Sequence, residues 1–293
     1  MIRLRLDPRV SAPAFHYRVA GRQLVADREL GWLAPFAVAA EGSKLAAVEA
    51  PPETASPGET IFAGNAFLAR RERFLSCRRQ AGAFLLEVEG LGAFRYRQDE
   101  GLLEATAADA GAPEALLAEV LLGPLLALAL AHRGVFLLHA SGCELDGAAW
   151  LILGESGAGK STLAANLGGL RLADDQAAID ADSCELLADF PQPKLDPAQQ
   201  VPLAAAGRRA VRGLLLLEKA ATDAEPELSP LPRLEAVAGI LRHTTAARCF
   251  DQELLRSHLD FAAGLGARVP CFRLLYPHRR DAFEKIGALL ARG

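Results

Sequence analysis

The sequence predicts an α/β fold, in which a domain of alternating strands and helices over residues 111–293 follows a small β-rich N-terminal domain over residues 1–110. Two observations lead to this prediction. Before about residue 110, short runs of strand-forming residues are separated by glycine and proline, which is typical of antiparallel sheets. After residue 111, apolar strand-like runs alternate with helix-like segments, which is the pattern of α/β domains.

The individual elements follow from these runs. In the N-terminal domain the sequence predicts a loop at residues 50–60 and strands at residues 2–6, 15–21, 84–90, 93–98 and 102–106. Glycines separate the last three runs, so these should form a small antiparallel meander. In the second domain it predicts helices at residues 113–134, 234–247, 254–267 and 280–293. Strands are expected there at residues 135–141, 149–153, 170–175, 212–218 and 271–277.

Composition excludes several classes of protein. A chain of 293 residues can bury a core without disulfides or metals, and 51% hydrophobic with 23% charged residues excludes a disordered chain or a coiled coil. A net charge of −4 argues against general nucleic-acid binding. The five cysteines form no CxxC pair, which favours reduced thiols. No signal peptide is visible, and the longest apolar stretch, residues 120–131, is too short to span a bilayer. We therefore expect a cytoplasmic protein with no membrane or nucleic-acid partner.

One strand-to-helix junction carries a phosphate-binding motif. Residues 154–161 read GESGAGKS and match GxxxxGK[ST], between the apolar run AWLIL and the helix-like STLAANL. Glycines allow backbone N–H groups to turn inward onto phosphate oxygens, Lys160 reaches the β- and γ-phosphates, and the Ser161 hydroxyl can bind Mg²⁺. The sequence thus predicts a P-loop that binds ATP and Mg²⁺. The predicted nucleotide contacts are Gly154, Glu155, Ser156, Gly157, Ala158, Gly159, Lys160, Ser161 and Thr162.

Three further residues are candidates for the chemistry beside this loop. Asp174 and Asp175 end the predicted strand LRLADD, thirteen residues after Ser161. Two neighbouring carboxylates there could have separate roles, because one can bind Mg²⁺ while the other accepts a proton from a hydroxyl. His139 lies on the predicted strand before the P-loop strand and could point into the same site. The alternatives are a turn with two solvated acids and a histidine satisfied within the core.

The order His139, GxxxxGKS and Asp174-Asp175 resembles the catalytic domain of the HPr kinase/phosphatase family, whose core is shared more distantly by phosphoenolpyruvate carboxykinases. The closer resemblance is to HPr-kinase-related kinases of the lasso-peptide-tailoring type, which also carry a Pro-x-Lys-Leu segment, here Pro193-Lys194-Leu195. Two departures stand out. Thr162 replaces the usual glutamate, and the later family signature is not intact around residues 211–213.

The resemblance implies transfer of the ATP γ-phosphoryl to a hydroxyl, typically a serine of a peptide or small protein, by a chain that forms homo-oligomers. It implies that Asp174 is the general base, that Asp175 and Ser161 serve the metal, and that His139 and Lys160 contact the phosphate. Lys194 would reach the transferring phosphate or the acceptor. The loss of the later signature puts the reverse, dephosphorylating reaction in doubt.

Other features and functions stay open. The segment RRERFLSCRR, residues 70–79, could bind an acidic acceptor through Arg70 and Arg71, or it could be a solvated face. The run LLLLE, residues 214–218, resembles a Walker B strand, but we interpret it as a core strand because no LSGGQ-like signature is present. A small-molecule hydroxyl kinase and a nucleotide-binding switch without catalysis are the alternative functions.

Overall fold

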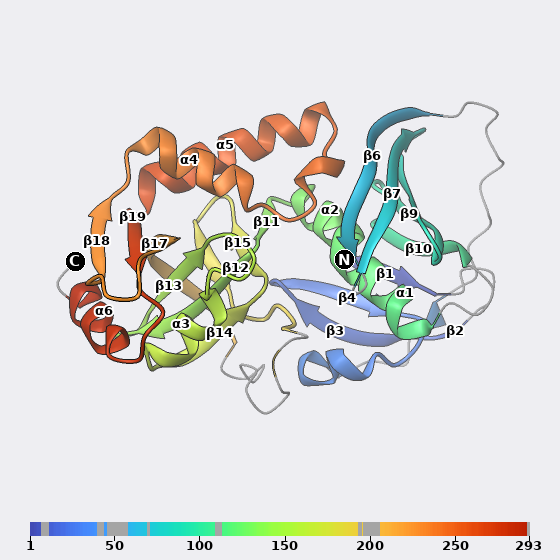
Figure 1. Ribbon diagram of the computed structural model, residues 1–293. Helices are drawn as coiled ribbons and strands as arrows, with labels where there is room; N and C mark the ends of the chain where they lie inside the picture. Colours follow the sequence, from blue (N-terminus) through green and yellow to red (C-terminus); the bar gives the residue numbers. More distant parts are fainter. Residues whose placement is uncertain are drawn as a thin grey trace. The chain divides into compact units, whose positions relative to one another are not determined.

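The computed structural model describes residues 1–6, 12–39, 44–45, 58–68, 71–108, 113–192, 195 and 206–291 (Figure 1). The chain is a mixed α/β protein with two compact units. The first unit comprises Met1–Arg133 and Ala246–Leu255, and the second comprises Gly134–Thr245 and Arg256–Gly293. Within the described ranges, no helix is both long and apolar enough to cross a membrane.

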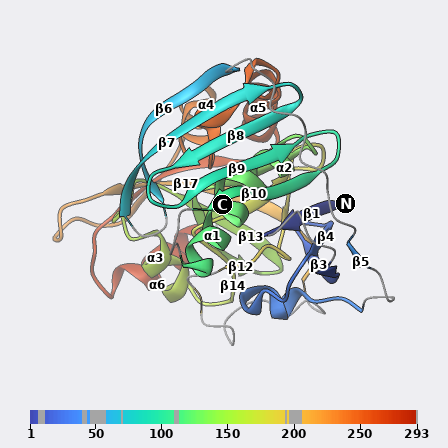
Figure 2. The same ribbon diagram turned by 90° about the vertical axis from the view of Figure 1, so that its right-hand side faces the viewer.

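The first unit contains a mixed eight-stranded sheet, with the strand order β3-β4-β1-β10-β9-β8-β7-β6 in the described part of the chain. Figure 2 shows β6 to β10 as successive strands of one antiparallel ribbon. The predicted meander at residues 84–106 is therefore confirmed. The strands are β1 (Ile2–Arg5), β3 (Phe15–Val19), β4 (Arg22–Ala26), β6 (Glu59–Leu68), β7 (Arg71–Gln80), β8 (Ala83–Val88), β9 (Gly92–Arg97) and β10 (Leu102–Ala108).

Shorter elements complete this unit. β2 (Ala12–Pro13) pairs with β5 (Lys44–Leu45), and two 3₁₀ turns, η1 (Gly31–Phe36) and η4 (Ala247–Cys249), are present. Residues 50–57 of the predicted loop lie outside the described residues, and its last residues, Glu59 and Thr60, already belong to β6. The long hairpin of β6 and β7 was not predicted.

The predicted helix at residues 113–134 is interrupted. It consists of α1 (Glu114–Val120), a π-helical segment η2 (Leu121–Leu125) and α2 (Leu126–Ala131). Gly123 has non-helical angles, φ −89° and ψ −105°, just before Pro124, whose missing N–H removes a helical hydrogen bond. The backbone widens there without ending the buried segment.

This helical segment also explains why the compact units differ from the predicted domains. The Arg133 Nη1 donates a hydrogen bond to the Tyr96 hydroxyl (3.1 Å), and Arg22 Nη2 donates one to the Arg133 carbonyl (2.8 Å). The segment therefore packs with the first sheet, and the first unit runs on to Arg133 instead of stopping at residue 110. The change of sequence pattern near residue 111 marks a change of secondary structure within one unit.

The second unit is built on a mixed sheet with the order β11-β15-β16-β17-β13-β12-β14, and with β19 and β18 on the far side of β17. β13 lies between a parallel neighbour, β17, and an antiparallel neighbour, β12. Its strands are β11 (Val135–Leu138), β12 (Ala140–Leu145), β13 (Ala148–Leu153), β14 (Leu170–Asp174), β15 (Ala177–Asp180), β16 (Glu185–Leu187), β17 (Arg208–Lys219), β18 (Glu227–Pro230) and β19 (Cys271–Tyr276).

Helices cover both faces of this sheet (Figure 1). α3 (Lys160–Asn166) and α6 (Ala282–Leu290) pack with the side chains of Trp150, Ile152 and Leu215 in one buried core. α4 (Arg233–Arg242) lies against Leu214 and Leu216 on the other face, and α5 (Gln252–Arg268) packs against α4. The described cysteines are free thiols, and all but Cys271 are buried.

The predicted strand at residues 135–141 is wrong as a single element. It is two strands, β11 and β12, with His139 between them. β11 pairs with β15, whereas β12 pairs with β13 and β14. The His139 N–H donates a hydrogen bond to the His243 carbonyl (2.6 Å), which holds the chain at the point where it passes from one partner to the other.

Trp150 on β13 fixes the spacing of the central strands. Its side chain is 2% exposed and lies flat against Gly213 of β17, where a Cβ atom would overlap the indole ring. A side chain at residue 213 would therefore push the parallel strands β13 and β17 apart.

We predict that Gly213→Ala lowers the free energy of unfolding by about 1–3 kcal/mol, because overpacking a core costs about this much. The matched control is Gly287→Ala in α6, where a Cβ atom would have no neighbour within 4 Å. Removing a glycine from a helix should raise stability by about 0.5–1 kcal/mol. Urea denaturation of both variants measures this. Equal stability of Gly213→Ala and wild type would contradict the packing described.

A buried histidine makes the stability of the second unit depend on pH. His258 is 4% exposed, packs near Phe136, and its Nε2 lies 2.8 Å from the Thr244 hydroxyl. That hydroxyl donates to the Ile240 carbonyl, so it accepts from the imidazole N–H. Burial lowers the pKa of His258 to about 4.

We predict that stability falls as the pH drops from about 6.5 towards 4, because the unfolded state then binds a proton that folded His258 excludes. His258→Gln should make this dependence shallower. Burial also lowers the pKa of His132 and His243, so part of the dependence remains. Urea midpoints between pH 7 and pH 4 test this, and identical slopes for wild type and His258→Gln would contradict it.

Candidate functional site

The loop between β13 and α3 has the backbone of a phosphate cradle. It spans Gly154–Gly159, and we call it the glycine-rich loop. Gly154, Gly157 and Gly159 have φ angles of +154°, +74° and +93°. At Gly159 a Cβ atom would lie 2.8 Å from His278 Cε1, so only glycine fits there without displacing that ring. Such turns direct successive N–H groups into a concave site for anions.

Lys160 places its charge inside this loop. The side chain is 8% exposed, and its Nζ donates hydrogen bonds to the carbonyl oxygens of Gly154 (2.8 Å) and Glu155 (3.1 Å). The ammonium group is thus held at the mouth of the glycine-rich loop, partly shielded from water. A cation in this position attracts a polyphosphate more strongly than a solvated surface lysine does.

A serine on β12 connects the loop to the carboxylates. Ser141 Oγ lies 3.4 Å from Ser161 Oγ at the start of α3, and it donates a hydrogen bond to Asp174 Oδ1 (3.1 Å). Ser141 and Asp174 are directly opposite each other in the pairing of β12 with β14. The strand register therefore brings the Asp174 carboxylate next to the hydroxyl that the motif assigns to Mg²⁺.

Asp174 is held rigidly from two more sides. Arg171 Nη2 lies 2.9 Å from Asp174 Oδ1 as an ion pair, and the Gln192 side-chain oxygen accepts the Asp174 N–H (2.8 Å). Residues three apart on a regular strand face opposite ways, but the register of β14 shifts between Arg171 and Ala173. This bulge puts Arg171 and Asp174 on the same face. Asp174 is 6% exposed.

Asp175 sits in a different environment from Asp174. Its side chain is 22% exposed, and its Oδ1 lies 3.2 Å from His139 Nδ1. Its φ angle of +110° is strained for a residue other than glycine. The Asp175 N–H donates to the Ala140 carbonyl (3.1 Å), and its own carbonyl lies 3.1 Å from His139 Nδ1. Strained residues held by their surroundings in this way are concentrated at functional sites.

A second histidine lies near the loop. His243 follows α4, is 7% exposed, and its carbonyl accepts a hydrogen bond from the His139 N–H. Burial lowers the pKa of His243, and the positive charge of Lys160 lowers it further, against the opposing effect of Glu155. The imidazole is therefore neutral near pH 7. The neighbouring Arg242 forms an exposed ion pair with Glu155 of the loop (3.7 Å).

The structure brings most of the predicted site residues together in the second unit. Residues 154–162, His139, Asp174 and Asp175 form one continuous constellation through the contacts above. Arg71 is instead exposed at the start of β7 in the first unit. Arg70 and Lys194 lie outside the described residues. Their predicted contacts with the acceptor therefore stay predictions.

Two other sequence interpretations can be compared with the structure. The run at residues 214–218 is a core strand, as predicted, and its Glu218 is turned away from the loop to pair with Arg273 (3.0 Å). Several arginines in residues 70–79 hold the first sheet together. Arg73 is buried and donates to the Glu89 carbonyl (2.7 Å), and Arg78 pairs with Glu87 (2.7 Å). These arginines of β7 therefore stabilise the first sheet and do not simply form a solvated face.

The donors present suit Mg²⁺ bound together with a nucleotide. Among the described residues, no group of three or more His, Cys, Asp and Glu side chains could hold a metal alone. Mg²⁺ in phosphoryl-transfer sites uses one or two protein oxygens with phosphate oxygens and water. The Ser161 hydroxyl and the Asp174 carboxylate, linked through Ser141, provide such oxygens.

Sequence reasoning missed Ser141, Arg171 and Gln192. Ser141 lies two residues after His139, so the alternation of side chains along a strand gives one signal for it. Using that signal would also have required knowing that the chain divides into β11 and β12 at His139. Arg171 depends on a bulge that has no mark in the sequence. Gln192 comes from a segment with no motif at all.

Comparison with known proteins does not assign the chain to a family. The chain matches none of the protein-family models, and no curated protein has a similar sequence. Its function is therefore inferred from the site itself.

We predict that Lys160→Ala weakens ATP binding by about tenfold or more, because the loop loses its buried cation. The matched control is Lys219→Ala, an exposed lysine at the end of β17. Titration calorimetry with ATP and Mg²⁺ compares the two. Wild-type affinity in a folded Lys160→Ala protein would show that the glycine-rich loop does not bind phosphates.

Proposed function

We propose that this protein is a kinase that transfers the γ-phosphoryl group of ATP to a hydroxyl of a peptide or small protein, with Mg²⁺ as cofactor. The observation that supports it most is the pair of carboxylates beside the glycine-rich loop. Asp174 is connected through Ser141 to Ser161, and Asp175 lies beside His139. A nucleotide-binding module without catalysis has no need for a second, strained carboxylate at this place.

The glycine-rich loop and Lys160 account for the donor. In the proposed complex the loop N–H groups and the Lys160 ammonium surround the β- and γ-phosphates and oppose the charge that collects on the equatorial oxygens. Bound Mg²⁺ would supply further neutralisation of this charge. Ser161 and Asp174 are the residues whose oxygens would hold it.

The environments of the two aspartates favour exchanging the roles that the family resemblance implies. Asp174 is almost fully buried, and its Oδ1 already accepts a hydrogen bond from Ser141 and forms an ion pair with Arg171. This suits a fixed carboxylate on the metal side. Asp175 is more exposed and is oriented by His139, so an acceptor hydroxyl can reach it. We therefore assign the general base to Asp175 instead of Asp174.

The proposed reaction is an in-line transfer of the γ-phosphoryl group to the acceptor oxygen. The acceptor hydroxyl oxygen attacks the γ-phosphorus in line with the leaving oxygen, the new O–P bond forms, and the bond to ADP breaks. The hydroxyl proton passes to the Asp175 carboxylate. His139 orients that carboxylate, and Lys160 stabilises the transferring phosphoryl group and the ADP. Catalysis consists mainly of positioning and electrostatic stabilisation.

We predict that Asp175→Asn reduces phosphoryl transfer by about 10²–10⁴-fold, the usual contribution of a general base, while Mg²⁺–ATP affinity changes little. Asp174→Asn should instead raise the Mg²⁺ concentration needed for ATP binding. Asp223→Asn, on an exposed turn, is the matched control. Measuring ATP affinity and single-turnover transfer separates the two effects. Loss of transfer with normal Mg²⁺ dependence in Asp174→Asn, and activity in Asp175→Asn, would instead assign the general base to Asp174, as the family resemblance implies.

The acceptor class is tested with the wild-type protein. Desalted peptides and small molecules from the native cell are added separately with Mg²⁺–ATP, and mass spectrometry follows the gain of one phosphoryl group. A new phosphopeptide supports the proposal. A phosphorylated small molecule would indicate a small-molecule kinase, and ATP binding without any product would indicate a nucleotide-dependent switch.

A further inference from the structure

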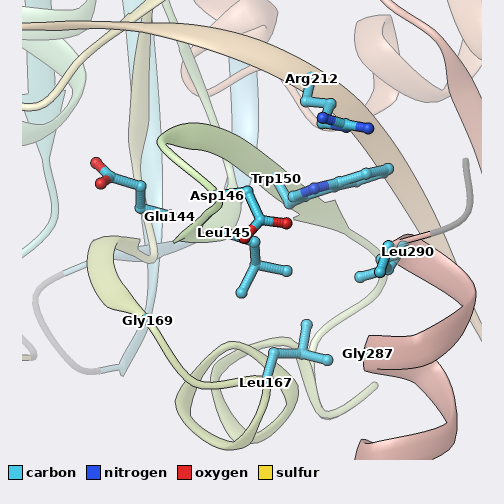
Figure 3. A pocket seen from close by; sticks show the side chains of 10 residues that line it. Glu144, Leu145, Asp146, Trp150, Leu167, Gly169, Arg212, Gly287 and Leu290 are labelled. Carbon is cyan, nitrogen blue, oxygen red and sulfur yellow. The ribbon is translucent and has the colours of Figure 1, made fainter.

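The second unit contains a cavity at the opposite end of β13 from the glycine-rich loop. Its volume is about 310 Å³, which is within the range of small-ligand sites. Figure 3 shows the residues that surround it, which come from the β12–β13 hairpin, β17, the end of α3 and α6. Trp150 is part of its wall, about four strand residues before Gly154, a separation of about 13 Å. The cavity is therefore separate from the proposed nucleotide site.

The wall of this cavity is rigidly built. Asp146 and Gly147 are the two residues of the β12–β13 hairpin turn, with φ angles of +50° and +79°, as a type I′ turn requires. Gly169 lies so close to the Glu144 carbonyl that no Cβ atom would fit, and Gly213 is covered by Trp150. Glu144 is fixed by an ion pair with Arg209 (2.7 Å). Such a wall does not need to rearrange to accept a ligand.

Two opposite charges line the cavity without neutralising each other. Arg212 and Asp146 are both exposed, and neither has an ion pair within 4.0 Å in the described part of the chain. In Figure 3 they lie on two sides of the Trp150 ring. The Trp150 side chain, which is 2% exposed, forms part of the cavity wall between them.

Apart from Glu144, which is paired with Arg209, the remaining lining is apolar or glycine. Leu145, Leu167 and Leu290 face the cavity from the hairpin, the end of α3 and α6. A ligand that fits must therefore combine an anionic group for Arg212, a cationic group for Asp146 and an apolar body. A simple anion would be repelled by Asp146, and a simple cation by Arg212.

We infer that this cavity binds a free α-amino acid with an apolar side chain. Its carboxylate would pair with Arg212, its ammonium would pair with Asp146, and its side chain would contact the leucines. A peptide terminus carries only one of the two charges, so it satisfies only one of the two residues. The inference is independent of the proposed kinase activity.

Titration calorimetry with L-leucine, L-isoleucine, L-methionine and L-phenylalanine tests the inference on the full chain. At least one should bind, and glycine should bind about tenfold more weakly because it lacks the apolar body. N-acetyl-L-leucine lacks the ammonium and L-leucinamide lacks the carboxylate, so each should bind about tenfold more weakly than L-leucine. No heat from any of the four amino acids at about 10 mM, where millimolar affinity is still measurable, would overturn the inference.

Three variants locate the site. Arg212→Gln and Asp146→Asn each remove one charge, and asparagine also suits the turn. Gly287→Leu adds a side chain to α6 where a Cβ atom meets open space in the cavity wall. Each should lose about tenfold or more in affinity without a lower melting temperature. Arg256→Gln, an exposed arginine on α5, should bind like wild type. Wild-type affinity in Arg212→Gln and Asp146→Asn, or equal binding of N-acetyl-L-leucine and L-leucine, would contradict the assignment.

Discussion

The placement of β12 is the constraint on which the proposed site depends. β12 lies antiparallel to β13 on one side and to β14 on the other, so Ser141 faces both the start of α3 and Asp174. Without β12, no side chain would link the Asp174 carboxylate to the start of α3. The same strand ends in the hairpin that forms the wall of the second cavity. One register thus fixes both the proposed nucleotide site and the opposite end of the second unit.

Much of the fold could be predicted, because it depends on local patterns. The meander at residues 84–106, the apolar strands at residues 149–153 and 212–218, and the glycine-rich loop that starts at Gly154 all follow from periodicity and glycine spacing. The break at His139 could not be predicted, since residues 135–141 form one continuous strand-like run, VFLLHAS, and only their different partners separate β11 from β12. Which compact unit the helical segment at residues 113–134 belongs to also could not be predicted, because it depends on contacts of Arg133 with residues distant in the sequence.

The residues of the candidate site likewise fall into those that the sequence predicted and those that it did not. The motif at residues 154–161 and the neighbouring aspartates were visible because their chemistry needs those residue types in that order. The residues that set their roles, Ser141 and Arg171, were not, because strand register and a bulge bring them there. For this reason the proposed exchange of roles between Asp174 and Asp175 rests on burial and contacts and not on the sequence.

In the proposed site, Mg²⁺–ATP binds across the glycine-rich loop, the start of β12 and the end of β14. Hydrogen exchange with a non-hydrolysable ATP analogue, with and without Mg²⁺, tests it most directly. The account predicts slower exchange in residues 154–162 with nucleotide, and additional Mg²⁺-dependent protection around residues 139–141 and 172–176. Protection of the loop alone, unchanged by Mg²⁺, would contradict the joint site, and no protection in either region would contradict nucleotide binding itself.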